Sequence, residues 1–589
     1  MALQFILGPS GSGRSCRLFQ WVIEESIKHP DRRFLVIVPE QFTMSTQRAL
    51  VTRHPRHGIL NIDVLSFKRL AQRVFEETGT NPGEVLTETG KNLLIRRAAS
   101  LCRNELEVMG SRMDQPGYVS EIKSILSEFA QYEIDGEDLD AMIALSRDIP
   151  LLYSKLKDIR TLHRTVEDLK RSRFITGEQM MEVLARSAPQ SVLLDGAVLA
   201  FDGFTGFTPV EYTALQAMMK KAADIKITLT MDSSVNLYSQ IREYELFAMT
   251  KQTVQKLSRM AQETGTPLLP PVLLKEPSAR FKEGSGLQAL ERTLFRWPAV
   301  RVRPASFEDI HICGYTSPAM ELNYTAEQIR NLIVRGGYRC RDIAVIAGSL
   351  PDYAAGAQYI FGQWGIPLFI DQTVNIVLNP CLEFIRGVLE MTEQNFSYES
   401  VFRFLRSGCS RIAEERIDEL EKYCLALGIR GRNRWQEEWT RKPRTMPEEQ
   451  VLSCEQTRAS LMERLGAFPE IFGRGKQEAS RLADELKDLC GRFELKEQME
   501  ERSEIFRLRG ERAKAIEFSQ IYDIVMDLLK EIQALLGTEV ISGREFSDIL
   551  EAGFSEAKIG IIPPGIDQVH MGDLERTRLE NIKVLFLSV

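Results

Sequence analysis

The sequence lacks the cysteine spacing of a zinc ribbon or a disulfide framework. Its nine cysteines are scattered over 589 residues and no two of them form a C-x-x-C pair, which is typical of a protein kept in a reducing cytoplasm. It also lacks an apolar run long enough to span a membrane, and its first residues resemble a strand rather than a signal peptide. We therefore expect a cytoplasmic protein that does not associate with membranes.

An excess of positive charge is also missing. The chain has 75 Lys and Arg residues against 82 Asp and Glu residues, a formal net charge of −7, and a pI of about 5.7. No global positive field is available to attract nucleic acid, so any DNA contact must come from local clusters of cations. The length allows several domains, and 43% hydrophobic and 27% charged residues are typical of a globular protein.

A nucleotide-binding loop near the start of the sequence lacks its lysine. Residues 8–15 read GPSGSGRS, which fits G-x-x-x-x-G-K-[ST] except that Arg14 replaces the Lys. Gly8, Gly11 and Gly13 allow backbone N–H groups to turn towards a phosphate, and the Ser15 hydroxyl is the usual Mg²⁺ ligand. Arg14 keeps the charge but presents a broad planar group instead of a compact ammonium. The sequence predicts weak or vestigial binding of ATP with Mg²⁺ at these five residues; the alternative is a glycine turn that binds nothing.

The acidic motif of an ATP-hydrolysing motor is incomplete. Such a motor needs an Asp for the magnesium shell and a Glu that orients the attacking water. Here Asp202 follows an apolar run at 198–201, and the next residue is Gly203 instead of Glu. Asp202 either begins a turn, since Asp-Gly is a strong turn dipeptide, or keeps a role in binding Mg²⁺. We therefore expect little ATP hydrolysis.

Hydrophobic patterning predicts two α/β regions, each interrupted by a mostly helical stretch. Apolar runs typical of buried parallel strands are found at 3–7, 34–39, 62–65, 191–194, 198–201, 225–230, 310–313, 343–346 and 583–589. The first α/β domain is predicted at 1–75 and 191–300, with a helical insertion at 76–190. The second is predicted at 301–378 and 552–589, with a helical insertion at 379–551. Because the sequence stops on a strand, we expect this second domain to be incomplete, as in a truncated reading frame or an incomplete gene model.

Two α/β domains that are each split by a helical insertion resemble superfamily 1 helicases, which have two RecA-like P-loop domains. Six motifs together resemble, more closely, the AddB subunit of the bacterial AddAB ATP-dependent helicase–nuclease. They are residues 8–13 (GPSGSG), 38–43 (VPEQFT), 65–70 (LSFKRL), 201–209 (FDGFTGFTP), 423–431 (YCLALGIRG) and 562–569 (IPPGIDQV). The resemblance covers the whole chain.

The resemblance implies a non-motor subunit in double-strand break repair by homologous recombination. The implied partner is an AddA-type helicase–nuclease subunit in a heterodimer, and the implied ligands are single-stranded and double-stranded DNA. AddB-type subunits continue into an exonuclease domain with a four-cysteine 4Fe–4S cluster. This chain ends before that domain, so we expect no cluster, no catalytic residue, no metal site, and no helicase or nuclease activity from the chain alone.

The resemblance also assigns a DNA site that recognises the recombination hotspot sequence Chi. It implies hydrogen bonds from Gln41 and Thr43, a stacking face on Phe67 and a phosphate or base contact from Arg69. Position 72 is Gln where relatives are expected to have Trp, a departure that affects either which hotspot sequence is read or whether one is read at all. The alternatives are a core aromatic at Phe67 and a solvated helix residue at Arg69.

Other candidates are weaker. Residues 430–444 combine basic residues with Trp435 and Trp439, a composition that binds nucleic acid strands, but two glutamates favour a solvated loop. Residues 496–502 resemble an exposed helix face, His570 has no catalytic pairing in the sequence, and Cys16 is expected to be a free structural thiol. Two alternatives to this function stay open. The chain could be an autonomous superfamily 1-like translocase, or it could be the product of a non-functional gene remnant.

Overall fold

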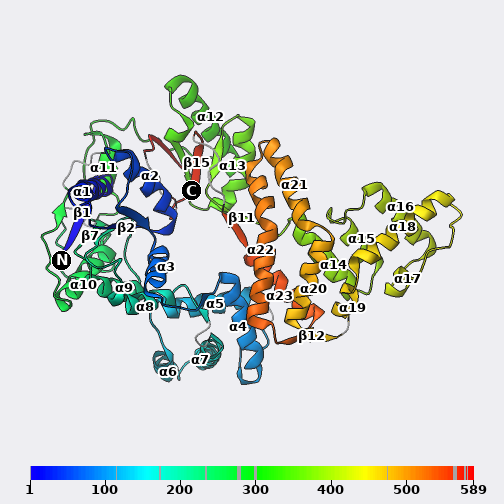
Figure 1. The fold of residues 1–589 in the computed structure, drawn as a ribbon. Helices are drawn as coiled ribbons and strands as arrows, with labels where there is room; N and C mark the ends of the chain where they lie inside the picture. The colour runs from blue at the N-terminus through cyan, green and yellow to red at the C-terminus, as the bar shows by residue number, and fades with distance from the viewer. Residues whose placement is uncertain are drawn as a thin grey trace. The chain divides into compact units, whose positions relative to one another are not determined.

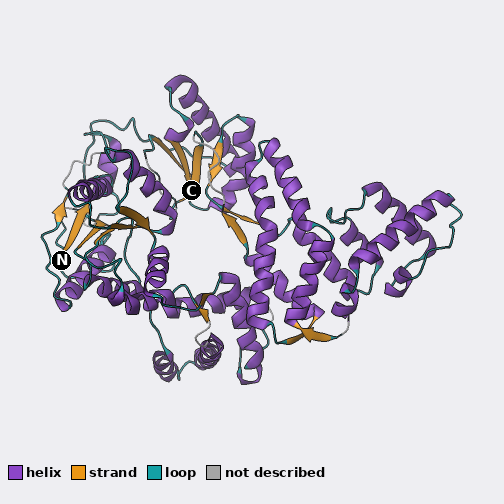
Figure 2. Ribbon diagram, in the orientation of Figure 1, coloured by secondary structure: helices purple, strands orange, loops and turns teal. Residues whose placement is uncertain are grey.

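The computed structural model of the protein describes residues 2–113, 116–170, 174–232, 235–274, 280–296, 301–473, 475–560, 567–575, 577, 579 and 581–588. The chain divides into two compact units. Unit 1 comprises Met1–Thr87 and Leu101–Cys313, and unit 2 comprises Glu88–Ser100 and Gly314–Val589. Strands and helices alternate in both units, which confirms the predicted α/β fold (Figure 2).

Unit 1 is built on a six-stranded parallel sheet with the order β3-β2-β6-β7-β1-β8. Figure 1 labels β1, β2 and β7 of this sheet. Its strands are β1 (Leu3–Gly8), β2 (Phe34–Ile37), β3 (Ile62–Leu65), β6 (Val198–Phe201), β7 (Asp224–Thr230) and β8 (Val272–Leu273). Five of these were predicted from apolar runs. β8 was not, because two residues give no periodicity.

Helices cover both faces of this sheet because successive strand residues point to opposite sides. Ile6 packs in a cluster with α1 (Arg14–Lys28) and α2 (Thr43–Arg53). Phe5 and Leu7 pack in a second cluster with α3 (Phe67–Thr78), α8 (Gln179–Ser187), α9 (Pro209–Met219) and α10 (Ala248–Glu263). The remaining helices of unit 1 are α5 (Pro116–Gln131), α6 (Gly136–Leu145), α7 (Pro150–Lys170) and α11 (Gly286–Thr293), and β4 (Glu84–Val85) pairs with β5 (Phe174–Ile175).

Unit 2 has a smaller parallel sheet with the order β10-β15-β9-β16. Its strands are β9 (Ile343–Ala347), β10 (Leu368–Ile370), β15 (Val569–Asp573) and β16 (Val584–Ser588), and α12 (Pro318–Gly336) and α13 (Leu350–Gln363) pack with them. On the edge strand β16, Leu585 and Leu587 are more than half exposed. Two short antiparallel pairs join β11 (Thr373–Asn375) to β14 (Lys558–Gly560) and β12 (Lys476–Glu478) to β13 (Val540–Ser542).

The rest of unit 2 is helical, as the sequence predicts for residues 379–551. The helices are α14 (Pro380–Glu393), α15 (Tyr398–Leu405), α16 (Glu414–Leu427), α17 (Arg432–Gln436), α18 (Glu448–Leu465), α19 (Phe468–Gly473), α20 (Ala479–Arg492), α21 (Leu495–Leu508), α22 (Arg512–Leu536) and α23 (Gly543–Glu556). Helix α4 (Glu88–Leu101) joins them, because Arg97 pairs with Glu539 (2.8 Å) and Arg96 donates to the carbonyl of Asp548 (3.1 Å). Within the described residues, no helix is long and apolar enough to cross a membrane.

Two predicted strands are wrong. Residues 191–194 form a turn, in which Ser191 Oγ accepts from the Leu194 N–H (3.3 Å) and donates to Glu77 (2.6 Å), so a side chain takes over bonds that a strand would make. Residues 310–313 are irregular, and Ile312 is 94% exposed. An apolar run needs a neighbouring strand to satisfy its backbone groups, and none of the described strands pairs with 310–313. The motif residues 562–566 lie outside the described part of the chain.

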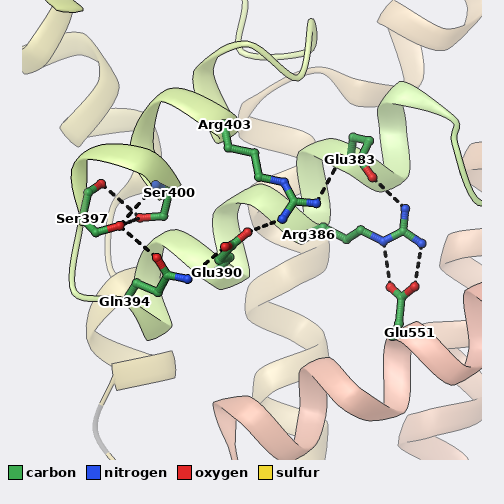
Figure 3. A network of polar contacts seen from close by, with 8 residues as sticks. All are labelled: Glu383, Arg386, Glu390, Gln394, Ser397, Ser400, Arg403 and Glu551. Carbon is green, nitrogen blue, oxygen red and sulfur yellow. Dashed lines mark hydrogen bonds and ion pairs between the residues drawn. The ribbon is translucent and has the colours of Figure 1, made fainter.

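An ionic network fastens the helical part of unit 2 where the chain enters and leaves it (Figure 3). Arg386 on α14 forms two bonds to Glu551 on α23 (2.7 and 2.8 Å), another to Glu383 (2.8 Å), and one to the carbonyl of Val377. Arg403 on α15 bridges Glu383 (3.3 Å) and Glu390 (2.5 Å). Val377 follows β11 and Glu551 precedes β14. The Arg386 guanidinium therefore connects the two segments through which the chain passes between the four-stranded sheet and the helices of unit 2.

This network predicts acid sensitivity. Burial alone would raise the pKa of Glu383, but hydrogen bonds from Arg386 and Arg403 outweigh it and the pKa lies below its ordinary value of 4.5. A carboxyl group with a lowered pKa stabilises the fold above its unfolded-state pKa, and that contribution is lost as the pH falls through the folded value. We expect Glu383→Gln to destabilise the chain by about 1 kcal/mol at pH 7, and the difference to close below about pH 4.

Urea unfolding at pH 7 and at low pH measures both differences. Glu399→Gln on α15 is the matched control, because Glu399 is exposed and has no ion pair to a described residue. A Glu383→Gln deficit that stays constant down to the lowest pH would contradict the assignment of the stabilisation to ionised Glu383.

Candidate nucleotide and DNA sites

All the candidate residues of unit 1 follow the carboxyl ends of parallel strands. The glycine loop follows β1, Gln41 follows β2, Phe67 and Arg69 follow β3, and Asp202 follows β6. Parallel strands end at one edge of a sheet, which is where open α/β sheets bind ligands. In the order β3-β2-β6-β7-β1, the DNA candidates lie at β3 and β2, the nucleotide loop lies at β1, and Asp202 lies between them.

The glycine loop has the backbone conformation that its sequence demands. Gly11 and Gly13 have φ angles of 74° and 86°, which favour glycine. A Cβ at Gly8 would lie 2.4 Å from Ser12 Oγ and 3.0 Å from Leu274 Cβ, so a side chain at that position would force its neighbours to shift. Gly13 is the N-cap of α1, and a glycine has no side chain with which to cap the first-turn N–H groups of the helix. A glycine turn that leads into a helix N-terminus is the kind of backbone arrangement that binds phosphate in proteins.

Asp202 is joined to the loop by hydrogen bonds. Its Oδ1 accepts from the Ser15 hydroxyl (2.8 Å) and from the Thr228 hydroxyl on β7 (2.6 Å), and the residue is 1% exposed. Gly203 beside it has a φ of 84° and the chain bends there, as expected for an Asp-Gly pair. The two interpretations of Asp202 are therefore compatible, and a hydroxyl beside a carboxylate is an oxygen donor set that suits Mg²⁺.

Arg14 points towards β7. Its Nη1 donates to Thr230 Oγ1 at 2.6 Å, at the last residue of that strand. A threonine hydroxyl thus helps to hold the guanidinium beside the glycine loop. No local spacing in the sequence marks Thr228 and Thr230, because Thr230 lies 216 positions from Arg14 and Thr228 lies 26 positions from Asp202.

The four predicted DNA residues have different surroundings. Gln41 is exposed in a short 3₁₀ helix (Glu40–Phe42), and Arg69 is exposed in the first turn of α3, where its N–H donates to the N-cap Ser66 (3.3 Å). Thr43 is 6% exposed and its hydroxyl donates to the carbonyl of Glu40 (2.9 Å). Gln41 and Arg69 are therefore available to a ligand, whereas Thr43 shapes the turn that presents Gln41.

Phe67 is packed as a core aromatic. It is 7% exposed, and its ring centroid lies 5.8 Å from that of Phe201, 5.6 Å from that of Phe204 and 6.3 Å from that of Phe207. This arrangement matches the core-aromatic alternative and leaves little ring face for a base. Phe204 and Phe207 are only partly buried, and the repeated three-residue spacing of Phe201, Phe204 and Phe207 was the signal that could have marked this cluster.

The weaker candidates are mostly structural. Trp435 and Trp439 are 1% and 5% exposed, so neither offers a face to a base. His570 packs on Phe369 (4.9 Å between ring centroids), and burial lowers its pKa despite the nearby Asp371. Cys16 is an exposed free thiol, and no group of three or more His, Cys, Asp or Glu side chains in the described residues could hold a metal ion.

Comparison with known proteins identifies the first half of the chain. Residues 5–291 match the family model described as "ADDB, N-terminal". These residues are therefore similar to the N-terminal domain of the AddB family. AddB-type relatives, each named as the B subunit of an ATP-dependent helicase/deoxyribonuclease, align with all of it: 38% identity over 593 residues in Lachnoclostridium phytofermentans, 32% over 588 in Clostridium novyi and 33% over 599 in Acetivibrio thermocellus.

The chain spans about half the length of these AddB relatives, 52%, 51% and 52% respectively. Their name describes one subunit of a larger enzyme, which implies a complex with at least one partner and DNA as its substrate. The activity and partners of the complete relatives therefore bear on this chain as proposals.

Proposed function

We propose that this chain is the N-terminal part of a non-motor subunit of an AddAB-type helicase–nuclease, acting in the cytoplasm in double-strand break repair by homologous recombination. An AddA-type partner supplies the motor in this proposal, and two RecA-like domains of superfamily 1 type hold the DNA. The names of the relatives support a subunit of such a complex. The substituted glycine loop and the missing glutamate after Asp202 support a role other than motor.

The observation that carries the DNA role is the placement of Gln41 and Arg69. β2 and β3 pair in parallel, with Ile37 opposite Leu65, so the segments that follow them leave the sheet as neighbours. One then presents an exposed amide and the other an exposed guanidinium. An amide can read a base edge, and a guanidinium can bind a phosphate or stack on a base. This pair suits a passive reader of a single strand and of a Chi-like hotspot within it.

The test is whether a complete subunit with substituted Gln41 or Arg69, assembled with its partner, still shortens its products at a hotspot. Unwinding that continues without hotspot products would support the reader role. Hotspot products at the unsubstituted yield would contradict it.

A bound nucleotide is a second part of the proposal. The loop from Gly8 to Gly13 would hold its phosphates, Arg14 would supply a cation, and Ser15 with Asp202 would hold Mg²⁺. Bound ATP with Mg²⁺ would place its negatively charged phosphates at the carboxyl ends of the strands of unit 1. The residues of the chain would bind and orient it, and Gly203 offers no group to activate water.

Arg14→Ala is expected to weaken ATP binding about five- to tenfold, because one charge-assisted hydrogen bond is removed at a partly exposed site. Arg14→Lys is expected to strengthen binding, since a compact ammonium suits this position. Calorimetric titration of the chain with Mg-ATP measures both. Arg17→Ala, an exposed cation on the same helix, is the control for net charge, and equal affinities for Arg14→Ala and Arg17→Ala would contradict the role of Arg14.

A further inference from the structure

A basic loop in unit 2 stands out in an acidic chain. Residues 430–444 contain six cations and two glutamates, a net charge of +4, whereas the whole chain has −7. The loop runs from the end of α16 through α17 to the start of α18 (Figure 1). Its composition was noted from the sequence, but the proposed single-strand reader makes no use of it.

Only some of these cations are engaged within the protein. Arg432 pairs with Glu470 (3.2 Å), Arg434 pairs with Glu437 (3.1 Å), and Lys442 lies 3.8 Å from Glu448. The other three are Arg430, Arg441 and Arg444. They are exposed, and their side chains make no hydrogen bond or ion pair with any described residue.

The backbone that carries these arginines is fixed by buried aromatic rings. Tyr423 on α16 stacks on Trp439 with ring centroids 4.9 Å apart, and Trp439 packs edge-on against Trp435 at 5.0 Å. The Tyr423 hydroxyl donates to the carbonyl of Arg441 (2.8 Å), and Trp439 Nε1 donates to the carbonyl of Arg434 (2.9 Å). The loop is therefore tied to α16 at Trp439 and Arg441, and Trp439 also joins it to its own earlier part at Arg434.

An ion pair on α18 braces the same loop. Arg458 is 7% exposed, binds Glu455 through two bonds (2.7 and 2.5 Å) and donates to the carbonyl of Trp435 (2.7 Å). Glu455 also accepts from the N–H of Trp439 (2.8 Å). A solvated loop needs no such support. Fixing the backbone lowers the entropy that three arginines lose when they bind a ligand.

We propose that Arg430, Arg441 and Arg444 bind the phosphate backbone of double-stranded DNA, an inference that rests on the proposed function in assuming that DNA is the ligand. Three unpaired guanidiniums on an acidic body favour a polyanion. Binding of single strands relies on exposed aromatic rings as well as cations, and both tryptophans of this loop are buried. Duplex DNA needs only phosphate contacts, so this surface binds it without regard to sequence.

The experiment compares the 589-residue chain with the triple variant Arg430→Ala, Arg441→Ala and Arg444→Ala. Fluorescence anisotropy with a labelled 30-base-pair duplex is recorded at several salt concentrations. We expect the triple variant to bind at least about tenfold more weakly at 50 mM salt. The negative slope of the logarithm of the association constant against log salt should become shallower by about 2.7, or 0.9 for each phosphate that no longer has a cation beside it.

The matched control removes three exposed cations that already have acidic partners, with Arg507→Ala, Lys514→Ala and Lys530→Ala. This control changes the net charge equally, and its duplex affinity and salt slope should stay close to those of the unsubstituted chain. Circular dichroism checks that both triple variants are folded. If the arginine triple variant does not fold, the experiment uses the single variants Arg430→Ala, Arg441→Ala and Arg444→Ala instead. Each is expected to lower the magnitude of the salt slope by about 0.9.

Equal losses in the two triple variants would overturn the proposal, because general charge would then explain them. Failure of the unsubstituted chain to bind duplex would overturn it as well. Unchanged single-strand binding on replacing Arg69 would contradict only the proposed reader in unit 1, so the failures of the two ideas are distinguishable.

Discussion

Phe67→Ala is expected to lower the free energy of unfolding of the chain by about 3–5 kcal/mol, the usual cost of removing a buried aromatic ring. The ring is 7% exposed and packs against three other phenylalanines at the carboxyl end of β6. Its loss leaves a cavity among Phe201, Phe204 and Phe207. The segment that carries Asp202 lies between two of these residues, so we also expect the nucleotide loop to bind more weakly.

Urea unfolding of the chain, followed by intrinsic fluorescence, measures this effect. Phe67→Leu should cost less than Phe67→Ala because most of the apolar volume is kept, and Lys68→Ala, at the exposed neighbouring position, should be nearly neutral. A Phe67→Ala variant as stable as the unsubstituted chain, but defective in binding single strands, would show instead that the ring faces DNA.

Gln41→Ala and Arg69→Ala are each expected to abolish the hotspot response of a complete AddAB-type complex while unwinding continues. Base contacts give specificity and phosphate contacts give general affinity, so Gln41→Ala should leave single-strand affinity nearly unchanged. Arg69→Ala should also weaken binding of any single strand about tenfold, which corresponds to one hydrogen bond of a charged group. Both side chains are exposed, so neither change should affect stability by more than about 0.5 kcal/mol.

A translocation assay on hotspot-bearing duplex resolves the two effects, because unwinding and hotspot-length products are separate readouts. Arg73→Ala is a suitable control. It removes the same charge one turn further along α3, but Arg73 is already paired with Asp63 (2.9 Å). Hotspot products at the normal yield from both Gln41→Ala and Arg69→Ala would contradict the reader role.

The sequence was sufficient to predict elements whose signal is local. β1, β2 and β6 are continuous apolar runs, and Gly11 and Gly13 occupy positions where a positive φ is required. It failed at 191–194 and 310–313, where equally apolar residues found no strand partner. Pairing in a sheet depends on segments far away in the chain, which the apolar content of a short run does not report.

The candidate site shows the same division. The residue types at 8–15 and at Asp202 were evident from spacing. The bonds that assemble them, Ser15 to Asp202 and Arg14 to Thr230, join distant positions and needed the structure. Burial separated Gln41 and Arg69 from Thr43 and Phe67, which pattern alone could not do because an aromatic at a helix start suits both a core and a ligand surface.

The most direct test of the central claim, a strand holder rather than a motor, measures ATP hydrolysis and single-strand binding on the same preparation of the chain. We predict retention of a labelled single strand that weakens about tenfold in Arg69→Ala, and no ATP hydrolysis above background with or without DNA. The claim would be contradicted by DNA-stimulated ATP hydrolysis that tracks with the purified chain and is lost in Asp202→Ala, because the chain would then be a translocase in its own right.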